Sequence, residues 1–456
     1  MRRNIPISML AAALYWTSAA VAAEPAAVEL AQPGVECRRD AGTLTRYLLC
    51  LELGARRPAE THSLYYDELE ELETGLLEDL PRGRGKQRPD ILPSLYHAGR
   101  GGTIYLAQLT LVDALDWRRR DPERRLAADC DILSLLNAGV AARYYGDDRP
   151  QYQVLVARTS HDHVANLLIR ATRPVSLLET VDGTILRGYL PARHDGRPIR
   201  PMTEREVVAL YVAHVGLALA REGRDEAALD NLDEALRLNP GEFVAWAGRA
   251  LALLLEVAAE PGDPALGSGP WCAGPAALPL LERADEAAAR ARARAPGEDS
   301  PYSLLGKIKL HQCEPEQARP YLERAVELSP DPLDLYYLGL ILHEQESFRE
   351  AIHQVRRGLQ LVLAGGDPRY AALRHEMEFL LAHAYTQRAN LLGSAGQLRK
   401  AMRYLEAVER EFPEDGTVLG LRRVIERLDH RIGPVRRDLG LPRLLGRSLY
   451  NASLDE

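Results

Sequence analysis

The chain has 456 residues, of which 46% are hydrophobic and 27% are charged, and its formal net charge is −8. This length exceeds one ordinary domain of about 100–200 residues, so two or three domains are expected. The modest negative charge excludes a globally basic protein, and we expect no nucleic acid among its partners. Only four Phe and four Trp accompany abundant Ala, Leu, Arg and Glu, which predicts close-packed helices.

The first 23 residues have the three parts of a secretory signal peptide. Residues 1–3 are Met-Arg-Arg, residues 5–20 form an apolar run, and residues 20–23 offer small side chains for cleavage. An uncleaved membrane anchor is the alternative, but the run is short for a bilayer span. We expect residues 1–23 to be removed and no later segment to span a membrane, which predicts a periplasmic or secreted mature protein.

Residues 24–195 are predicted to form an N-terminal domain that begins with helices and changes character after Cys130. From Cys130 onwards the apolar residues fall on one helical face, which predicts a helix with this cysteine in its first turn and Gly146 at its end. A helix N-terminus favours a thiolate, and an adjacent imidazolium strengthens the effect. After this helix, apolar residues recur with the spacing typical of β-strands. This pattern predicts an antiparallel meander over 152–157, 163–169, 175–179 and 184–190.

The helix and the strand that follows it resemble the transglutaminase-like cysteine-enzyme superfamily, especially bacterial versions fused to tetratricopeptide repeats. Residues 129–146, Asp-Cys-Asp-Ile-Leu-Ser-Leu-Leu-Asn-Ala-Gly-Val-Ala-Ala-Arg-Tyr-Tyr-Gly, resemble the family's nucleophile helix, which begins at Cys130. Residues 162–166, Asp-His-Val-Ala-Asn, resemble the strand that carries the family's histidine, which maps to His163.

Residues 178–183, Leu-Glu-Thr-Val-Asp-Gly, resemble the strand end that carries the family's acidic residue. Glu179 is the best match and Asp182 is the second choice. The resemblance implies a papain-like α+β fold in which a thiolate attacks a carbonyl, an imidazole activates the thiol and a carboxylate orients the imidazole. It implies hydrolysis of a peptide or isopeptide, or acyl transfer to an amine.

The same residues also have a purely structural interpretation. Cys130 alone is typical of a small buried hydrophobe, and His163 alone is typical of an ordinary hydrogen-bonded histidine. His161 and His163 together with Cys130 would supply too few ligands for a zinc site, so we expect no metal and no cofactor.

Residues 193–203 are predicted to be a linker, and Thr203 with Glu206 predicts a capping box for the first helix of a repeat array over 204–430. Within the array, small or apolar residues recur at offsets 0, 12, 16 and 19 and a proline recurs at offset 24. Two units follow this pattern: Gly216, Ala228, Leu232, Ala235 and Pro240, then Gly306, Ala318, Leu322, Ala325 and Pro330.

A further unit begins at Gly339, 33 positions after Gly306, which is close to the 34-residue tetratricopeptide period. Small residues at offsets 0 and 12 allow two helices to approach closely, and the proline ends the second helix. Residues 223–240 resemble a tetratricopeptide second helix almost position for position. The predicted fold is therefore mostly α-helical, a transglutaminase-like α+β domain followed by a tetratricopeptide α-solenoid.

Weaker units are predicted around 246–296, with a Gly/Pro-rich insertion near 260–276, and around 385–413. A capping helix from about 418 to 430 should end the array. Residues 431–456 are predicted to be a basic tail, either solvated or docked on an acidic surface.

Export would allow disulfides among the five cysteines. Cys272 and Cys313 fall in corresponding turns of adjacent repeats, and stacked repeats place such turns side by side. We therefore predict a Cys272–Cys313 disulfide, with two reduced cysteines as the alternative. Cys37 and Cys50 lie close together in sequence, and Cys130 has no obvious partner.

Two functions fit these patterns. The first is an exported thiol enzyme that acts on a protein substrate recruited by the repeats. The second is a noncatalytic periplasmic scaffold that binds a partner protein or peptide in the groove of the repeats. The sequence does not decide between them and does not indicate an oligomeric state.

Overall fold

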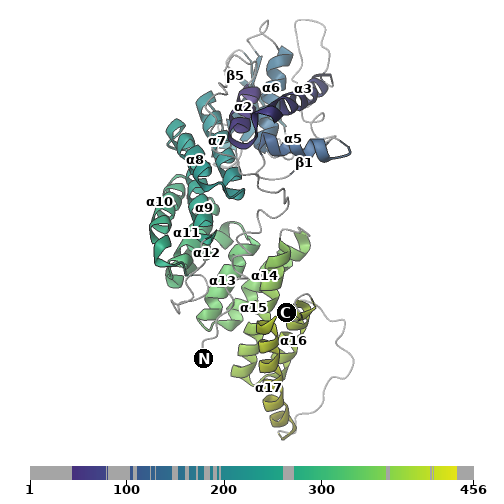
Figure 1. Ribbon diagram of the computed structural model, residues 1–456, viewed down its shortest axis with the longest axis vertical. Coiled ribbons are helices and arrows are strands. Elements are labelled where there is room, and N and C mark those ends of the chain that lie inside the picture. Colours follow the sequence, from purple (N-terminus) through teal and green to yellow (C-terminus); the bar gives the residue numbers. More distant parts are fainter. Residues whose placement is uncertain are drawn as a thin grey trace. The chain divides into compact units, whose positions relative to one another are not determined.

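The computed structural model describes residues 44–78, 80, 103–105, 110–123, 125–128, 130–145, 152–159, 164–170, 173–178, 185–187, 193–194, 197–259, 272–365, 370–410, 413 and 415–438. The chain divides into two compact units (Figure 1). The N-terminal unit comprises the described residues up to 259 and from 273 to 308, and the C-terminal unit comprises Cys272 and the described residues from 309 onwards. The predicted signal peptide, residues 1–23, and Cys37 lie outside the described residues.

The N-terminal unit begins with helices packed beside a sheet. Its first elements are α2 (Leu44–Arg56), the 3-10 turn η1 (Ala59–Thr61), α3 (His62–Glu78), α5 (Leu111–Arg120) and α6 (Cys130–Tyr145). A short parallel pair joins β1 (Thr103–Tyr105) to β2 (Leu126–Ala128). Helix α6 starts at Cys130 and ends just before Gly146, which confirms the predicted extent of this helix.

The sheet of the N-terminal unit has five strands in the order β6-β5-β4-β3-β9. Consecutive antiparallel pairing from β3 to β6 confirms the predicted meander. Helix α6 packs on β3 and β4. The strands are β3 (Tyr152–Arg158), β4 (Val164–Arg170), β5 (Arg173–Leu178), β6 (Ile185–Arg187) and β9 (Arg200–Pro201).

The segment predicted to be a linker, 193–203, is instead partly built into sheets. Strand β9 pairs with β3, and β7 (Arg193–His194) pairs with β8 (Arg197–Pro198). Proline cannot donate a ladder hydrogen bond, so such strands belong at sheet edges, where β9 lies. The segment ends at Thr203, whose side chain accepts a hydrogen bond from the Glu206 amide while Glu206 accepts from the Thr203 amide, which confirms the capping box.

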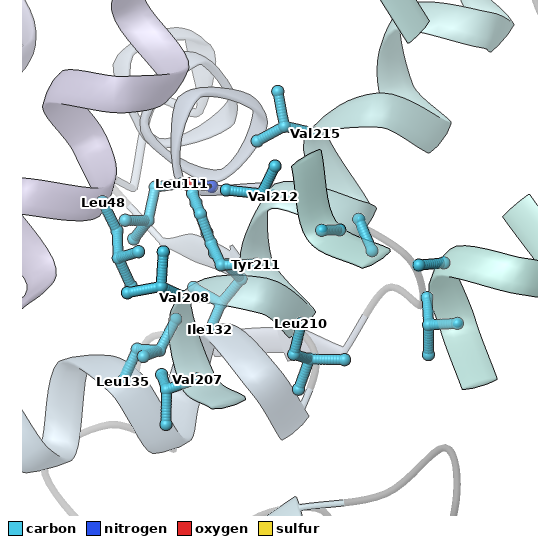
Figure 2. Close-up of a cluster of buried hydrophobic side chains, with 14 of the residues drawn as sticks. Leu48, Leu111, Ile132, Leu135, Val207, Val208, Leu210, Tyr211, Val212 and Val215 are labelled. Carbon is cyan, nitrogen blue, oxygen red and sulfur yellow. Dashed lines mark hydrogen bonds between the residues drawn. The ribbon is translucent and has the colours of Figure 1, made fainter. Parts of the chain in front are cut away.

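Helix α7 (Glu204–Arg221) is buried on almost all sides. In Figure 2 its residues Val208, Tyr211 and Val212 lie among side chains that include Leu48 of α2 and Ile132 of α6. The same hydrophobic cluster includes residues of α8 (Asp225–Leu238), α9 (Phe243–Ala259) and α10 (Leu278–Arg294). A helix that is apolar around its circumference is typical of such a buried position. We call α2, α3, α5, α6 and the sheet the α/β part. Its core therefore continues into the first repeat hairpins, across the predicted boundary at 195–204.

The hairpins of the array depend on small residues at their helix crossings. A Cβ atom added to Gly216 would lie 2.7 Å from Cγ of Leu232, and one added to Gly339 would overlap Val355. These two glycines occupy offset 0 of their repeats. The structure therefore confirms that a small residue at this offset allows the two helices to approach closely.

The C-terminal unit is a series of helices that pack against their neighbours in chain order. Its described helices are α12 (Pro315–Leu328), α13 (Pro332–Glu344), α14 (Phe348–Gly365), α15 (Ala371–Leu392), α16 (Ala395–Glu409) and α17 (Gly416–Asp438), preceded by α11 (Ser300–His311) at the boundary between the units. Helix α17 extends to Asp438, so the first part of the predicted tail, 431–438, is helical. Within the described residues no helix is long and apolar enough to cross a membrane.

A disulfide joins Cys272 to Cys313, as predicted. Cys313 lies in the turn before α12 and has a positive φ of 63°. Gly223, Glu346 and Gly393 occupy the same place, two residues before α8, α14 and α16, with φ of 72°, 59° and 56°. Glycine adopts this left-handed conformation without a Cβ clash, whereas cysteine and glutamate do so at a cost. Cys50 is also disulfide-bonded, whereas Cys130 forms no disulfide.

Candidate functional site

Cys130, the predicted nucleophile, is a buried thiol at the first position of α6. Its side chain is 7% exposed, and the thiol donates to Oδ1 of Asp131 at 3.7 Å. A carboxylate that accepts from a thiol stabilises the protonated form, which opposes the effect of the helix N-terminus. The structure therefore shows a buried thiol in contact with a neighbouring carboxylate.

Asp131 connects this thiol to the first repeat helix. Its Oδ2 atom lies 2.6 Å from Nε2 of His214 on α7. Burial acts to raise the pKa of Asp131, but His214, Arg158 and the hydrogen bond from Cys130 outweigh it and hold this pKa below its ordinary value. Asp131 is therefore ionised, and its short contact with His214 ties α6 to α7.

A buried ion pair links the sheet to the turn before α9. Arg158 on β3 donates to both carboxylate oxygens of Glu242, at 3.1 and 2.9 Å, and the side chain of Asn239 donates to the same carboxylate at 3.1 Å. Glu242 is 1% exposed. Together with Cys130, Asp131 and His214, these residues form what we call the Asp131 cluster.

Helix α6 is also fixed to the sheet by buried amides. The side chain of Asn137 donates to Asn166 on β4 at 2.9 Å, and Asn166 donates to the carbonyl of Ser134 at 2.9 Å. Asn166 is fully buried. Because an unpaired buried amide is costly, these bonds fix the register of α6 against β4.

The other three predicted site residues, His163, Glu179 and Asp182, lie outside the described residues. The described strands stop next to two of them, since β4 begins at Val164 and β5 ends at Leu178. The predicted set of Cys130 with these residues therefore stays a prediction.

Sequence reasoning missed Asp131 and His214. Asp131 follows Cys130 directly, and His214 is the one imidazole in the apolar stretch 207–220. An ionisable side chain within a helix that is apolar on all faces signals a buried partner. That signal could have identified His214, but not its partner, which is far away in sequence.

A second buried cluster, which we call the Arg56 cluster, joins α2, α5 and α7. The Arg56 guanidinium pairs with Glu52 at 2.6 Å, with Asp113 at 2.8 Å and with Glu222 at 2.6 Å. Glu52 also accepts from the hydroxyls of Thr110 and Tyr211. Burial raises the pKa of Glu52, and the positive charge of Arg56 acts against this rise. Every charge in the cluster is satisfied from within the protein, so the cluster is a structural anchor.

The C-terminal unit has a hollow of about 560 Å³ between α16 and α17, lined by Glu406, Glu409, Arg410, Pro413 and Arg422. Arg422 and Glu409 pair with each other across it. Among the described residues, no group of three or more His, Cys, Asp and Glu side chains is arranged to hold a metal ion.

The hairpin of α11 and α12 has the spacing predicted for the repeat, with Gly306 on its first helix and buried Ala318, Leu322 and Ala325 on its second. Residues 300–332 match the tetratricopeptide repeat family. This match confirms the tetratricopeptide interpretation for the unit predicted from Gly306 to Pro330. No curated protein matches the chain.

Several solved tetratricopeptide repeat structures are similar to part of the chain. YrrB, described as a TPR protein with an unusual peptide-binding site, has 18% identity over 47% of this chain and 92% of its own, with a TM-score of 0.34. PilW, a type IV pilus biogenesis factor, has 15% identity over 52% of this chain and 96% of its own, with a TM-score of 0.34. MamA has 14% identity over 47% of this chain and 98% of its own, with a TM-score of 0.32. Scores this low carry no argument about what the present chain binds.

Proposed function

We propose that this protein is a scaffold whose tetratricopeptide repeats hold a partner protein or peptide. The observation that carries the proposal is the tetratricopeptide match at residues 300–332 within a series of helices that pack in chain order. Stacked helical hairpins form extended surfaces on which many side chains contact one ligand. The α/β part fits this role as a rigid anchor, because its core and the Arg56 cluster include α7.

The environment of Cys130 supports a noncatalytic role for the α/β part. Its thiol is buried and donates to Asp131, and Asp131 is already paired with His214. A nucleophilic cysteine needs access to substrate and a neighbour that favours the thiolate. The contacts of Cys130 favour packing and the protonated thiol instead.

The proposed scaffold works outside the cytoplasm, in the periplasm or as a secreted protein. The sequence pattern of residues 1–23 and the Cys272–Cys313 disulfide support this location, because disulfides persist in oxidising compartments. Intact-mass analysis of the mature chain should show a start after residue 22 or 23. A mature chain that retains residues 1–20 would contradict the proposal of a cleaved signal peptide.

A second candidate function is thiol-dependent acyl chemistry by a transglutaminase-like domain, with Cys130, His163 and either Glu179 or Asp182. The observation that favours it is the position of Cys130 at the start of a helix packed on an antiparallel meander, the arrangement that the resemblance implies. If it is correct, iodoacetamide should modify Cys130 in the folded protein faster than in the denatured chain. Labelling slower than that of the denatured chain would exclude an activated thiol.

The scaffold proposal is tested by chemical cross-linking of the full mature chain in its native host, followed by mass spectrometry. We expect a partner protein whose cross-links fall in the repeat helices between residues 204 and 438. The Cys130→Ala variant should capture the same partner to the same extent. A chain that captures no partner, or loses it on the Cys130→Ala change, would contradict the proposal.

A further inference from the structure

Two tyrosines on adjacent helices of the C-terminal unit stack in parallel. The rings of Tyr385 on α15 and Tyr404 on α16 have centroids 5.9 Å apart and planes inclined by 7°. The ammonium of Lys400, also on α16, lies 5.7 Å from the centroid of the Tyr385 ring. A cation at this distance from a ring is attracted by its electron-rich face.

Three arginines act on the Tyr385 ring, Arg356 also through a hydrogen bond, and two of the three act on the Tyr404 ring as well. Burial raises the pKa of Tyr385, and the positive charges of Arg356, Arg388 and Arg403 act against this rise. Burial also raises the pKa of Tyr404, again opposed by Arg356 and Arg403. Arg356, Arg388, Lys400 and Arg403 therefore converge from three helices on two stacked rings, and we call this group the Tyr385 cluster.

Within the described part of the chain, the cations of the Tyr385 cluster lie beside rings rather than carboxylates. Across the described residues, no ion pair joins any of the four to Asp or Glu, whereas Arg319, Arg374 and Arg422 in the same unit each pair with a glutamate. Glu378 is the acid that faces Tyr404, and it is bonded to Arg374 at 3.1 Å. A chain with a net charge of −8 thus concentrates at one place positive charge that no described carboxylate neutralises.

An exposed apolar pair lies beside the Tyr385 cluster. Leu391 is 67% exposed and Leu392 is 60% exposed, which are high values for large hydrophobic residues. They follow Arg388 by three and four positions on α15, so they lie on the same side of this helix. The surface therefore combines arginine side chains with two adjacent leucines.

We propose that the cations of the Tyr385 cluster and the exposed Leu391 and Leu392 form a surface that binds an acidic amphipathic segment of a partner protein. The inference rests on the proposed scaffold function, because the occupant is part of the partner. Guanidinium groups bind carboxylates in bidentate geometry, and the leucines cover the apolar residues of the segment. The leucines favour a protein segment over nucleic acid, and the negative net charge opposes binding of an extended polyanion.

Fluorescence anisotropy with the full mature chain tests this proposal. The probe is a synthetic helical peptide with Glu and Leu at i, i+3 and i+4 spacing, and the control peptide carries Lys in place of Glu. We expect the Glu/Leu peptide to bind more weakly as salt rises, and the control peptide not to bind. The double variant Arg388→Glu/Arg403→Glu should weaken binding at least about tenfold.

The control variant Arg324→Glu reverses an exposed arginine on α12 and should change the affinity by less than about twofold. Circular dichroism and thermal melting establish that both variants are folded. Equal binding to the double variant and the unmodified chain would overturn the proposal. So would stronger binding of phosphatidylglycerol vesicles or single-stranded DNA than of the Glu/Leu peptide.

The same double variant separates this inference from the scaffold function. The partner captured by cross-linking could still bind the double variant with unchanged efficiency. In that case the scaffold function stands and the proposed binding surface is wrong. Loss of that partner from the double variant, but not from Arg324→Glu, is the expected result.

Discussion

The Arg56 cluster and the Tyr385 cluster use the same residue type for opposite purposes. In the N-terminal unit, the Arg56 side chain is 4% exposed and three carboxylates surround it. In the C-terminal unit, Arg356, Arg388 and Arg403 have no carboxylate partner among the described residues and surround two tyrosines. Buried charges that satisfy one another hold helices together, whereas unpaired charges near solvent remain available to a ligand.

The largest expected loss of stability comes from a substitution in the Arg56 cluster. Arg56→Ala should lower the free energy of unfolding by about 3–5 kcal/mol, because it leaves the fully buried Glu52 without its cation. The matched control is Arg57→Ala, which removes a partly exposed pair with Asp116 and should cost about 1 kcal/mol or less. Urea denaturation measures both. Equal losses would show that the buried cluster is no more stabilising than a surface pair.

A half-buried pair of uncharged histidines provides a pH test within the C-terminal unit. Nε2 of His343 and Nδ1 of His383 are 2.7 Å apart and share a hydrogen bond. Burial, together with His383, lowers the pKa of His343 to about 3. The unfolded chain therefore binds a proton below about pH 6.5 that the folded chain does not, and stability falls as the pH drops through this window.

This linkage predicts that the protein is about 2 kcal/mol less stable at pH 5 than at pH 8 through His343 alone. His343→Gln should remove that part of the loss, whereas His353→Gln, at an exposed position of α14, should leave it unchanged. Urea denaturation at the two pH values measures the difference. If the His343 variant and the unmodified chain had the same pH dependence, this would contradict a neutral histidine pair in the folded protein.

The residue with positive φ, two positions before the second helix of a hairpin, allows a test in both units with a smaller expected change in stability. Glu346→Gly should raise the free energy of unfolding by up to about 1 kcal/mol, because it removes the Cβ clash at φ of 59°. Gly223→Ala and Gly393→Ala should each lower it by about 1 kcal/mol for the opposite reason. Thermal melting measures all three. A destabilised Glu346→Gly protein would show that contacts of this glutamate outweigh its backbone cost.

The smallest expected change in stability comes from a substitution in the Tyr385 cluster. Arg403→Gln should change the free energy of unfolding by no more than about 0.5 kcal/mol, because the side chain is exposed and forms no ion pair with a described residue. A loss comparable to that of Arg56→Ala would show that the Tyr385 cluster holds the fold together. The contrast between the two clusters would then be wrong.

Local patterns in the sequence predicted the elements that depend on neighbouring residues. Spacing within a few turns of chain was enough to predict the start of α6 at Cys130, the capping box of Thr203 and the glycines Gly216 and Gly339 at their helix crossings. The Cys272–Cys313 disulfide could be predicted because the repeat period places one turn beside the next.

Predictions from the sequence failed where the deciding contact joins residues that are far apart in the chain. They also failed where Arg, Gly and Pro residues lie inside a strand or helix instead of ending it. The segment 193–203 is rich in Arg and Pro and looks like a linker, yet β9 pairs with β3 at the sheet edge. Helix α17 continues past Gly433 and Pro434, residues that normally end a helix. The Asp131–His214 pair joins two helices far apart in sequence, so no local pattern could predict it.

The most direct test of the account is hydrogen–deuterium exchange of the full mature chain with and without the Glu/Leu peptide. We predict slower exchange in α15 and α16 around Arg388 and Arg403 when the peptide is bound, with no change in α2, α5 and α7, where the Arg56 cluster already satisfies its charges. Protection confined to α2, α5 and α7, or no protection at a saturating peptide concentration, would contradict the division between a structural cluster and a binding cluster.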